Sequence, residues 1–174
     1  SLMQLTRLIC SGFRCLKDVS FQPGPGLNLI VGANAQGKTS LLESLLYVAT
    51  ARSHRTTQDV ELVQYGGQGF RIAAWVERRT RPVVIEAAYY NGAKRFRVNG
   101  IPQSRVSDIL GKINVVSFFA EDVALVRGAA SQRRRLLDIE LSKVYPQYLR
   151  SLQQYRQVLR QRNEVLRRKS TKPE

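Results

Sequence analysis

Eight consecutive residues in the first quarter of the chain could hold the phosphates of a nucleotide. They match the pattern G-x-x-x-x-G-K-[ST] without a gap and are Gly32, Ala33, Asn34, Ala35, Gln36, Gly37, Lys38 and Thr39. Backbone N–H groups of such a turn, followed by a helix N-terminus, surround phosphate oxygens. Lys38 would contact the β- and γ-phosphates, and Thr39 would offer its hydroxyl to Mg²⁺. The pattern predicts binding of a nucleoside triphosphate with Mg²⁺.

The flanking sequence favours the strand and the helix that such a loop requires. Residues 27–31, "LNLIV", form an apolar run typical of a strand that is covered on both faces. A helix is expected from about Lys38, with its inner side formed by Leu41, Leu42, Leu45, Leu46 and Val48. A mere glycine-rich turn capping a helix would leave Lys38 and the paired glycines without a role.

The middle of the chain predicts an antiparallel sheet. Two short strands are expected within residues 5–24, and three more in residues 70–78, 82–90 and 94–100. Asn91–Gly92 is a strong signal for a hairpin between the last two. A short helix is then expected within 102–111 and another buried strand in 113–119. The sequence therefore predicts an α/β fold with an antiparallel β subdomain.

From Ser131 onward the chain is helix-forming, with a break at Tyr145–Pro146 because proline suits the first turn of a new helix. The last helix carries an apolar stripe interrupted by Arg162, made of Tyr148, Leu152, Tyr155, Leu159 and Leu166. This spacing is typical of a coiled-coil arm. A single amphipathic helix on a globular core is an equal alternative.

The formal net charge of +15 in 174 residues indicates a polyanionic partner, nucleic acid rather than membrane. Residues 131–174 hold twelve Lys or Arg against four Asp or Glu, a net +8. The candidates for phosphate contact with DNA are Arg133, Arg134, Arg135, Arg156, Arg160 and Arg167. A solvated helix face is the alternative. The sequence has no eighteen-residue apolar run and no secretory signal core after Met3, the expected natural start, so a cytoplasmic location is expected.

Other nucleotide-binding classes fit less well. No N-K-x-D base-reading element occurs, which argues against a small GTPase, and the antiparallel middle third argues against a small-molecule kinase. Asp138 and Glu140 end an apolar stretch, as the metal-binding acids of such ATPases do. However, the three arginines at 133–135 make a poor buried strand, and the spacing is helical. These two acids are therefore expected to be exposed helical residues.

The order of motifs resembles the RecF family of recombination and repair proteins, which are ABC-type ATPases related to the heads of Rad50 and of structural-maintenance-of-chromosomes proteins. The matching stretches are "SGFRCLKDVSF", "GANAQGKTSLLESL", "ARSHRTTQDVELV" and "NVVSFFAEDVALVRGAASQRRRLLDIEL". The chain departs from the family at Ala120 and at Ala129–Ala130. The resemblance places Arg14 and Glu121 near the nucleotide. It also marks His54 and Arg55, without a physical role for either.

This resemblance implies an ATP-binding lobe at residues 3–130 and the start of a helical lobe at 131–174. It also implies ATP and Mg²⁺ as ligands, an ATP-dependent homodimer of the complete protein, and DNA gaps or junctions as the target. RecO- and RecR-like proteins and a recombinase would be partners in replication, repair and the SOS response. The ABC signature and the acidic strand have no match, so we expect an N-terminal half that does not hydrolyse ATP alone. The alternatives are a non-catalytic DNA-binding module with a vestigial loop and a free-standing kinase.

Overall fold

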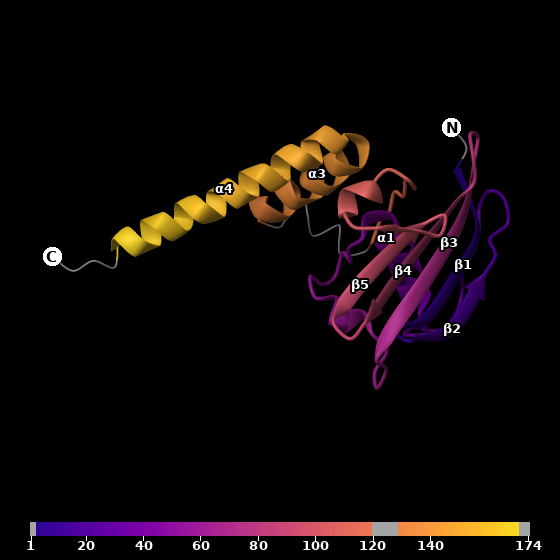
Figure 1. Cartoon of the computed structure of the whole chain (residues 1–174). Coiled ribbons are helices and arrows are strands. Elements are labelled where there is room, and N and C mark those ends of the chain that lie inside the picture. The colour runs from indigo at the N-terminus through magenta and orange to yellow at the C-terminus, as the bar shows by residue number, and fades with distance from the viewer. Residues whose placement is uncertain (1–2, 120–128, 171–174) are drawn as a thin grey trace. The chain divides into compact units, whose positions relative to one another are not determined.

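The computed structural model describes residues 3–119 and 129–170. The chain divides into two compact units, Ser1–Phe118 and Phe119–Glu174. The first unit contains a six-stranded sheet and helix α1, and the second contains helices α3 and α4 (Figure 1). Within the described ranges, no helix has the length and apolar character needed to cross a bilayer.

The sheet of the first unit is antiparallel throughout, as predicted for the middle of the chain. Its spatial order is β2-β1-β3-β4-β5-β6. The strands are β1 (Met3–Phe13), β2 (Leu16–Phe21), β3 (Gly69–Arg78), β4 (Val83–Tyr90), β5 (Ala93–Val98) and β6 (Ile101–Gln103). The hairpin at Asn91–Gly92 is confirmed, since both residues have left-handed φ angles, 49° and 79°.

Alternating side chains divide the sheet into a buried and a solvent face. On β3, Phe70, Ile72, Ala74 and Val76 are buried, whereas Arg71 between them is exposed. This period of two is what a sheet with one packed face requires.

Helix α1 (Lys38–Thr50) covers the buried face and contacts β1, β3 and β4. Tyr47 is fully buried, and its ring lies 5.4 Å from that of Phe70 and 5.9 Å from that of Phe96. The predicted inner side is confirmed for Leu41, Leu46 and Val48, and Leu45 is half-buried. Leu42 was wrongly assigned to it, because its side chain is 49% exposed. Most of the other residues of α1 are buried, including the polar Ser40, Glu43 and Ser44.

The two predicted buried strands, 27–31 and 113–119, are wrong. No described strand pairs with either segment, and neither is a strand. Several of their apolar side chains face solvent instead: Leu27 is 96% exposed, Leu29 83%, Val31 77%, Val116 94% and Phe118 77%. An apolar run predicts burial only when a neighbouring strand exists to cover it. The described part of the chain supplies no such neighbour.

Two short 3₁₀ helices complete the first unit, η1 (Asp59–Leu62) and η2 (Val106–Asp108). The helix predicted within 102–111 is therefore reduced to a single turn. Its first residues belong to strand β6 instead.

The second unit contains two contacting helices, α3 (Ala130–Val144) and α4 (Pro146–Ser170). The predicted break is confirmed, because Tyr145 separates them and Pro146 starts α4. Along the predicted stripe, Leu152 and Leu159 are half-buried, but Tyr155 is 62% exposed and Leu166 49%. Leu149, which lies outside the predicted stripe, is buried.

Candidate nucleotide-binding site

The phosphate-loop motif, Gly32–Thr39, forms a turn that leads directly into α1. Ala35 and Gly37 adopt left-handed backbone angles, with φ of 64° and 93°. Gly37 is the N-cap of α1, and its carbonyl accepts a hydrogen bond of 2.9 Å from the N–H of Leu41. The free N–H groups of the first turn therefore lie directly after the loop, as the motif requires.

Gly37 cannot be replaced by a larger residue without moving its surroundings. A Cβ at this position would lie 2.7 Å from Cδ2 of Leu16 and 3.1 Å from Sγ of Cys15. The turn between β1 and β2 thus packs directly on the start of α1. Glycine suits this position because of its left-handed backbone angle, and a Cβ here would also displace the Leu16 and Cys15 side chains.

Lys38 bends back over the loop. Its Nζ donates hydrogen bonds to the backbone carbonyls of Gly32, at 2.8 Å, and of Ala33, at 2.6 Å. The ammonium group is therefore held within the turn, next to the N-terminus of α1. Thr39, in the first turn of the helix, has an exposed side chain.

A buried carboxylate connects three segments beside the loop. Glu43 in α1 is 0% exposed and accepts hydrogen bonds from Nε and Nη2 of Arg14, at 3.1 Å and 3.0 Å. Ser53 Oγ donates to the same carboxylate at 2.5 Å, and Nη1 of Arg14 donates to the carbonyl of Glu61 at 3.0 Å. The network joins the β1–β2 turn, α1 and the segments after it.

The sequence analysis missed Glu43 and Ser53. A signal existed, since a glutamate inside the apolar stretch "LLESLL" must be either exposed or paired. The structure places Arg14 in this network, next to the turn that packs on Gly37. Its predicted proximity to a nucleotide stays a prediction.

Residues 53–56 include His54 and Arg55, which match the RecF-like motif. The backbone of this segment is hydrogen-bonded to the network. The N–H of Arg55 and that of Thr56 donate to Ser53 Oγ, at 2.9 Å and 3.3 Å. The hydroxyl that binds Glu43 thus also shapes the turn around His54. Glu121, the other residue predicted near the nucleotide, lies outside the described residues.

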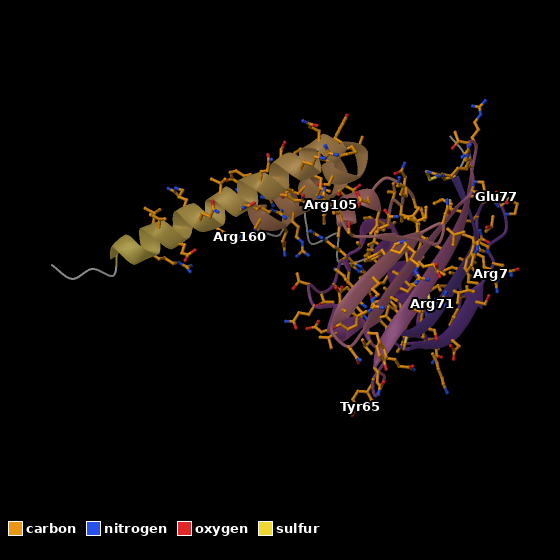
Figure 2. The ribbon with its side chains drawn as sticks, viewed as in Figure 1. Arg7, Tyr65, Arg71, Glu77, Arg105 and Arg160 are labelled. Carbon is orange, nitrogen blue, oxygen red and sulfur yellow. The ribbon has the colours of Figure 1, made fainter. Side chains whose placement is uncertain are left out.

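The DNA candidates belong to the second unit and differ in their surroundings. Arg133, Arg134 and Arg135 are exposed in the first turns of α3, and Arg160 and Arg167 are exposed on α4, where Figure 2 labels Arg160. Arg156 donates to Asp138 at 2.8 Å, and the Tyr148 hydroxyl donates to the same carboxylate at 2.7 Å.

The acids predicted to be exposed helical residues do lie in α3. However, Asp138 is half-buried and paired, so only part of that prediction is right. Its ion pair with Arg156 holds α3 and α4 together within their unit.

Comparison with known proteins assigns the chain, including its phosphate loop, to a family. A family model described as "AAA domain" matches residues 7–171, nearly the whole chain. The chain belongs to the AAA domain family. Among the described residues of this AAA domain chain, no group of three or more His, Cys, Asp or Glu side chains could hold a metal ion.

Curated relatives of the AAA domain chain carry the name DNA replication and repair protein RecF. Those from Lacticaseibacillus casei and Halalkalibacterium halodurans are each 40% identical to it, over 154 and 158 residues. The matches cover 88% and 90% of this chain but 42% of each relative. The chain therefore spans less than half the length of these relatives. The predicted resemblance to part of a RecF protein is confirmed.

Solved structures agree with the sequence matches. The recombination mediator protein RecF with ATP, of the RecFOR pathway, has a TM-score of 0.88 and 34% identity, covering 95% of this chain and 46% of that chain. The head domain of a structural-maintenance-of-chromosomes protein from Thermotoga maritima has a TM-score of 0.52 and 17% identity, covering 61% and 40%. The second likeness concerns the fold alone. The predicted fold class, a P-loop nucleotide-binding lobe with an antiparallel sheet and a helical arm, is confirmed.

Proposed function

We propose that this chain is the ATP-binding lobe of a RecF-like DNA repair protein. The observation that carries the proposal is the loop itself: Gly37 packs on the β1–β2 turn at a left-handed angle, and Lys38 follows at the start of α1. This arrangement presents backbone N–H groups and one ammonium group to the same small volume, which suits a triphosphate. ATP is the nucleotide named with the similar RecF structure.

Mg²⁺ is the metal that fits the available donor. The exposed hydroxyl of Thr39 is a hard oxygen ligand in the first turn of α1, and Mg²⁺ is usually held by one or two protein oxygens together with the phosphates. The ion would offset the negative charge of the phosphates when bound. Lys38 would exchange its two loop carbonyls for phosphate oxygens.

The complete protein would carry the further activities. We propose that it dimerises with ATP, binds gapped or junction DNA and aids recombinase loading in the cytoplasm, together with RecO- and RecR-like partners. The net charge of +15 and the likeness to DNA replication and repair proteins support the DNA part. The acidic strand that such ATPases use for hydrolysis has no match in this sequence, so the chain alone should bind ATP without turnover.

The decisive experiment is a titration of the full chain with ATP and Mg²⁺ by calorimetry. Replacing Lys38 by Ala removes a charged donor and should weaken binding by about 1.5–3 kcal/mol, roughly ten- to a hundredfold. Lys112→Ala removes an exposed lysine elsewhere and should bind as the wild type does. Sustained phosphate release by the wild type would contradict the expected lack of turnover.

One observation favours the rival, a DNA-binding module with a vestigial loop. The Lys38 ammonium donates hydrogen bonds to two carbonyls of its own loop, which is how a purely structural lysine would behave. In that case wild type and Lys38→Ala would bind ATP equally weakly, while Lys38→Ala would lower the melting temperature.

A further inference from the structure

The solvent face of the sheet has a hollow lined by arginines. It measures about 240 Å³ and lies on β3, β4 and β5, with lining residues Arg71, Glu86, Ala87, Ala88, Arg95 and Arg97. Figure 2 shows Arg71 on the broad face of the sheet. Helix α1 packs on the opposite, buried face. The hollow is therefore separate from the phosphate loop.

Strand register explains how the hollow forms. Ala88 pairs with Arg71 on one side and Arg95 on the other, and Glu86 pairs with Ala73 and Arg97. Directly paired residues point to the same face, so the long side chains stand around small ones. The small side chain of Ala88 leaves space at the bottom of the hollow. The longer side chains of Arg71, Arg95 and Arg97 surround that space.

The charges around the hollow do not cancel. Glu86 forms an ion pair with Arg71, so the charges of these two side chains offset each other. Arg95 and Arg97 are exposed, and within the described ranges neither has an ion-pair partner. Two guanidinium groups are thus left to bind an anion. They lie two residues apart on one strand, about 7 Å along it.

A further arginine extends the positive face across the sheet. Arg7 on β1 points to the solvent face, and its guanidinium lies 5.3 Å from the ring centre of Trp75 on β3. The positive side chains therefore lie on β1, β3 and β5, whereas β4 contributes Glu86. From β1 to β5 the face spans roughly 14 Å at the usual spacing between strands. A track of this length fits a polymeric anion better than a single small one.

We propose that this face binds the sugar–phosphate backbone of DNA, with Arg95 and Arg97 as direct phosphate contacts. The inference rests on the proposed function, because it assumes that the chain binds DNA. The forked guanidinium matches a phosphate in two hydrogen bonds, which lysine cannot do. No base-specific donor set is involved, so the contact is independent of sequence.

The test measures DNA affinity of the full chain over a salt series, with single-stranded and duplex oligonucleotides. Arg95→Ala/Arg97→Ala should lower the slope of log affinity against log salt by about 1.4–1.8, the loss of two phosphate contacts. Arg79→Ala/Arg81→Ala, two exposed arginines of the β3–β4 turn, removes the same charge and should keep the wild-type slope. Arg95→Lys/Arg97→Lys should also keep the slope but bind more weakly.

Several outcomes would overturn the inference. Equal slopes for the wild type and Arg95→Ala/Arg97→Ala, or an equal drop in both alanine pairs, would show that the hollow makes no specific contact. Polyglutamate serves as a probe for an acidic protein partner. If Arg95→Ala/Arg97→Ala loses binding to polyglutamate but binds DNA as the wild type does, the face would bind an acidic protein instead of DNA. If the wild type binds ATP through Lys38 but no DNA, this inference fails while the nucleotide part of the proposed function stands. Unchanged melting temperatures would exclude misfolding as the cause of any loss.

Discussion

Arg14 and Glu43 form a bidentate ion pair that connects α1 to the turn between β1 and β2. The Nε and Nη2 atoms of Arg14 lie 3.1 Å and 3.0 Å from the two carboxylate oxygens of a fully buried Glu43. Because the same turn packs on Gly37, the pair also fixes where the phosphate loop begins. A structural ion pair thus supports the proposed binding site without touching a ligand.

Removing one partner of this pair should be costly. Glu43→Ala would leave the guanidinium of Arg14 and the hydroxyl of Ser53 without their acceptor, and should lower the free energy of unfolding by about 3–5 kcal/mol. Glu77→Ala, on the exposed face of β3, should change it by less than about 0.5 kcal/mol. Urea denaturation measures both. A loss in Glu43→Ala no larger than in the control would contradict the role of the pair.

Alanine substitutions at Gly37 and Gly26 should distinguish the cost of backbone strain from the cost of a steric clash. Both have left-handed φ angles, 93° and 83°, but a Cβ at Gly26 would meet no atom within 4 Å. Gly26→Ala should therefore cost only backbone strain, about 1–2 kcal/mol. Gly37→Ala should cost more, because Leu16 and Cys15 must move, and should also weaken ATP binding. Similar melting temperatures for the two variants would argue against the close packing.

Tyr47 should make stability fall at alkaline pH. Burial, followed by the nearby Asp59 carboxylate that accepts its hydrogen bond at 3.0 Å, raises the pKa of the Tyr47 phenol well above its usual value. The unfolded chain releases this proton near pH 10, so the contribution is complete below that pH and is lost as pH rises further.

Tyr47→Phe should remove up to about 1.4 kcal/mol per pH unit of this alkaline slope. It should also lower stability at neutral pH by about 1 kcal/mol through the lost hydrogen bond. Unfolding free energies measured between neutral pH and pH ~11 test both effects. Tyr65→Phe, at a fully exposed position, should leave the profile unchanged. An unaltered slope in Tyr47→Phe would mean that another group titrates.

Asp138 should hold the two helices of the second unit together. Its hydrogen bond raises the pKa of the Tyr148 phenol, and it also pairs with Arg156. Asp138→Asn should lower the Tyr148 pKa toward the ordinary value in a spectroscopic titration, and should speed amide exchange in the first turns of α4 several-fold. Gln153→Ala, exposed on α4, should do neither.

The apolar segment at 27–31 should make the isolated chain self-associate. Leu29 and Phe118 are 83% and 77% exposed, in segments without a sheet partner among the described strands. Leu29→Ser/Phe118→Ser should shift sedimentation toward monomer and reduce binding of an apolar dye. Val60→Ser, 56% exposed elsewhere, should not. A wild-type chain that is monomeric at all concentrations would contradict this expectation.

Local signals in the sequence were sufficient to predict most helices, strands and turns. The hairpin at Asn91–Gly92, the break at Pro146 and the phosphate loop are each specified by residues that are neighbours in the chain. Turn geometry and helix starts depend on backbone angles of a few residues, so sequence reasoning finds them. The core side of α1 was also predictable, apart from Leu42.

Features that depend on distant partners were not predictable in the same way. Residues 27–31 have the composition of a buried strand, but burial requires a neighbour that composition does not reveal. Glu43 is buried because Arg14, 29 positions away, reaches it. The hollow around Ala88 depends on register across three strands, which the sequence specifies only once the pairings are known.

The order of the strands has a consequence for biosynthesis. Neighbouring strands of the sheet follow closely along the polypeptide, apart from the β1–β3 pairing, and the last strand ends at Gln103. The sheet and α1 can therefore assemble on the ribosome before helices α3 and α4 have been translated. Leu27, Leu29 and Val31 leave the ribosome before β3–β6 and are exposed in the folded chain as well, so we expect a chaperone that binds apolar segments to bind the nascent chain there.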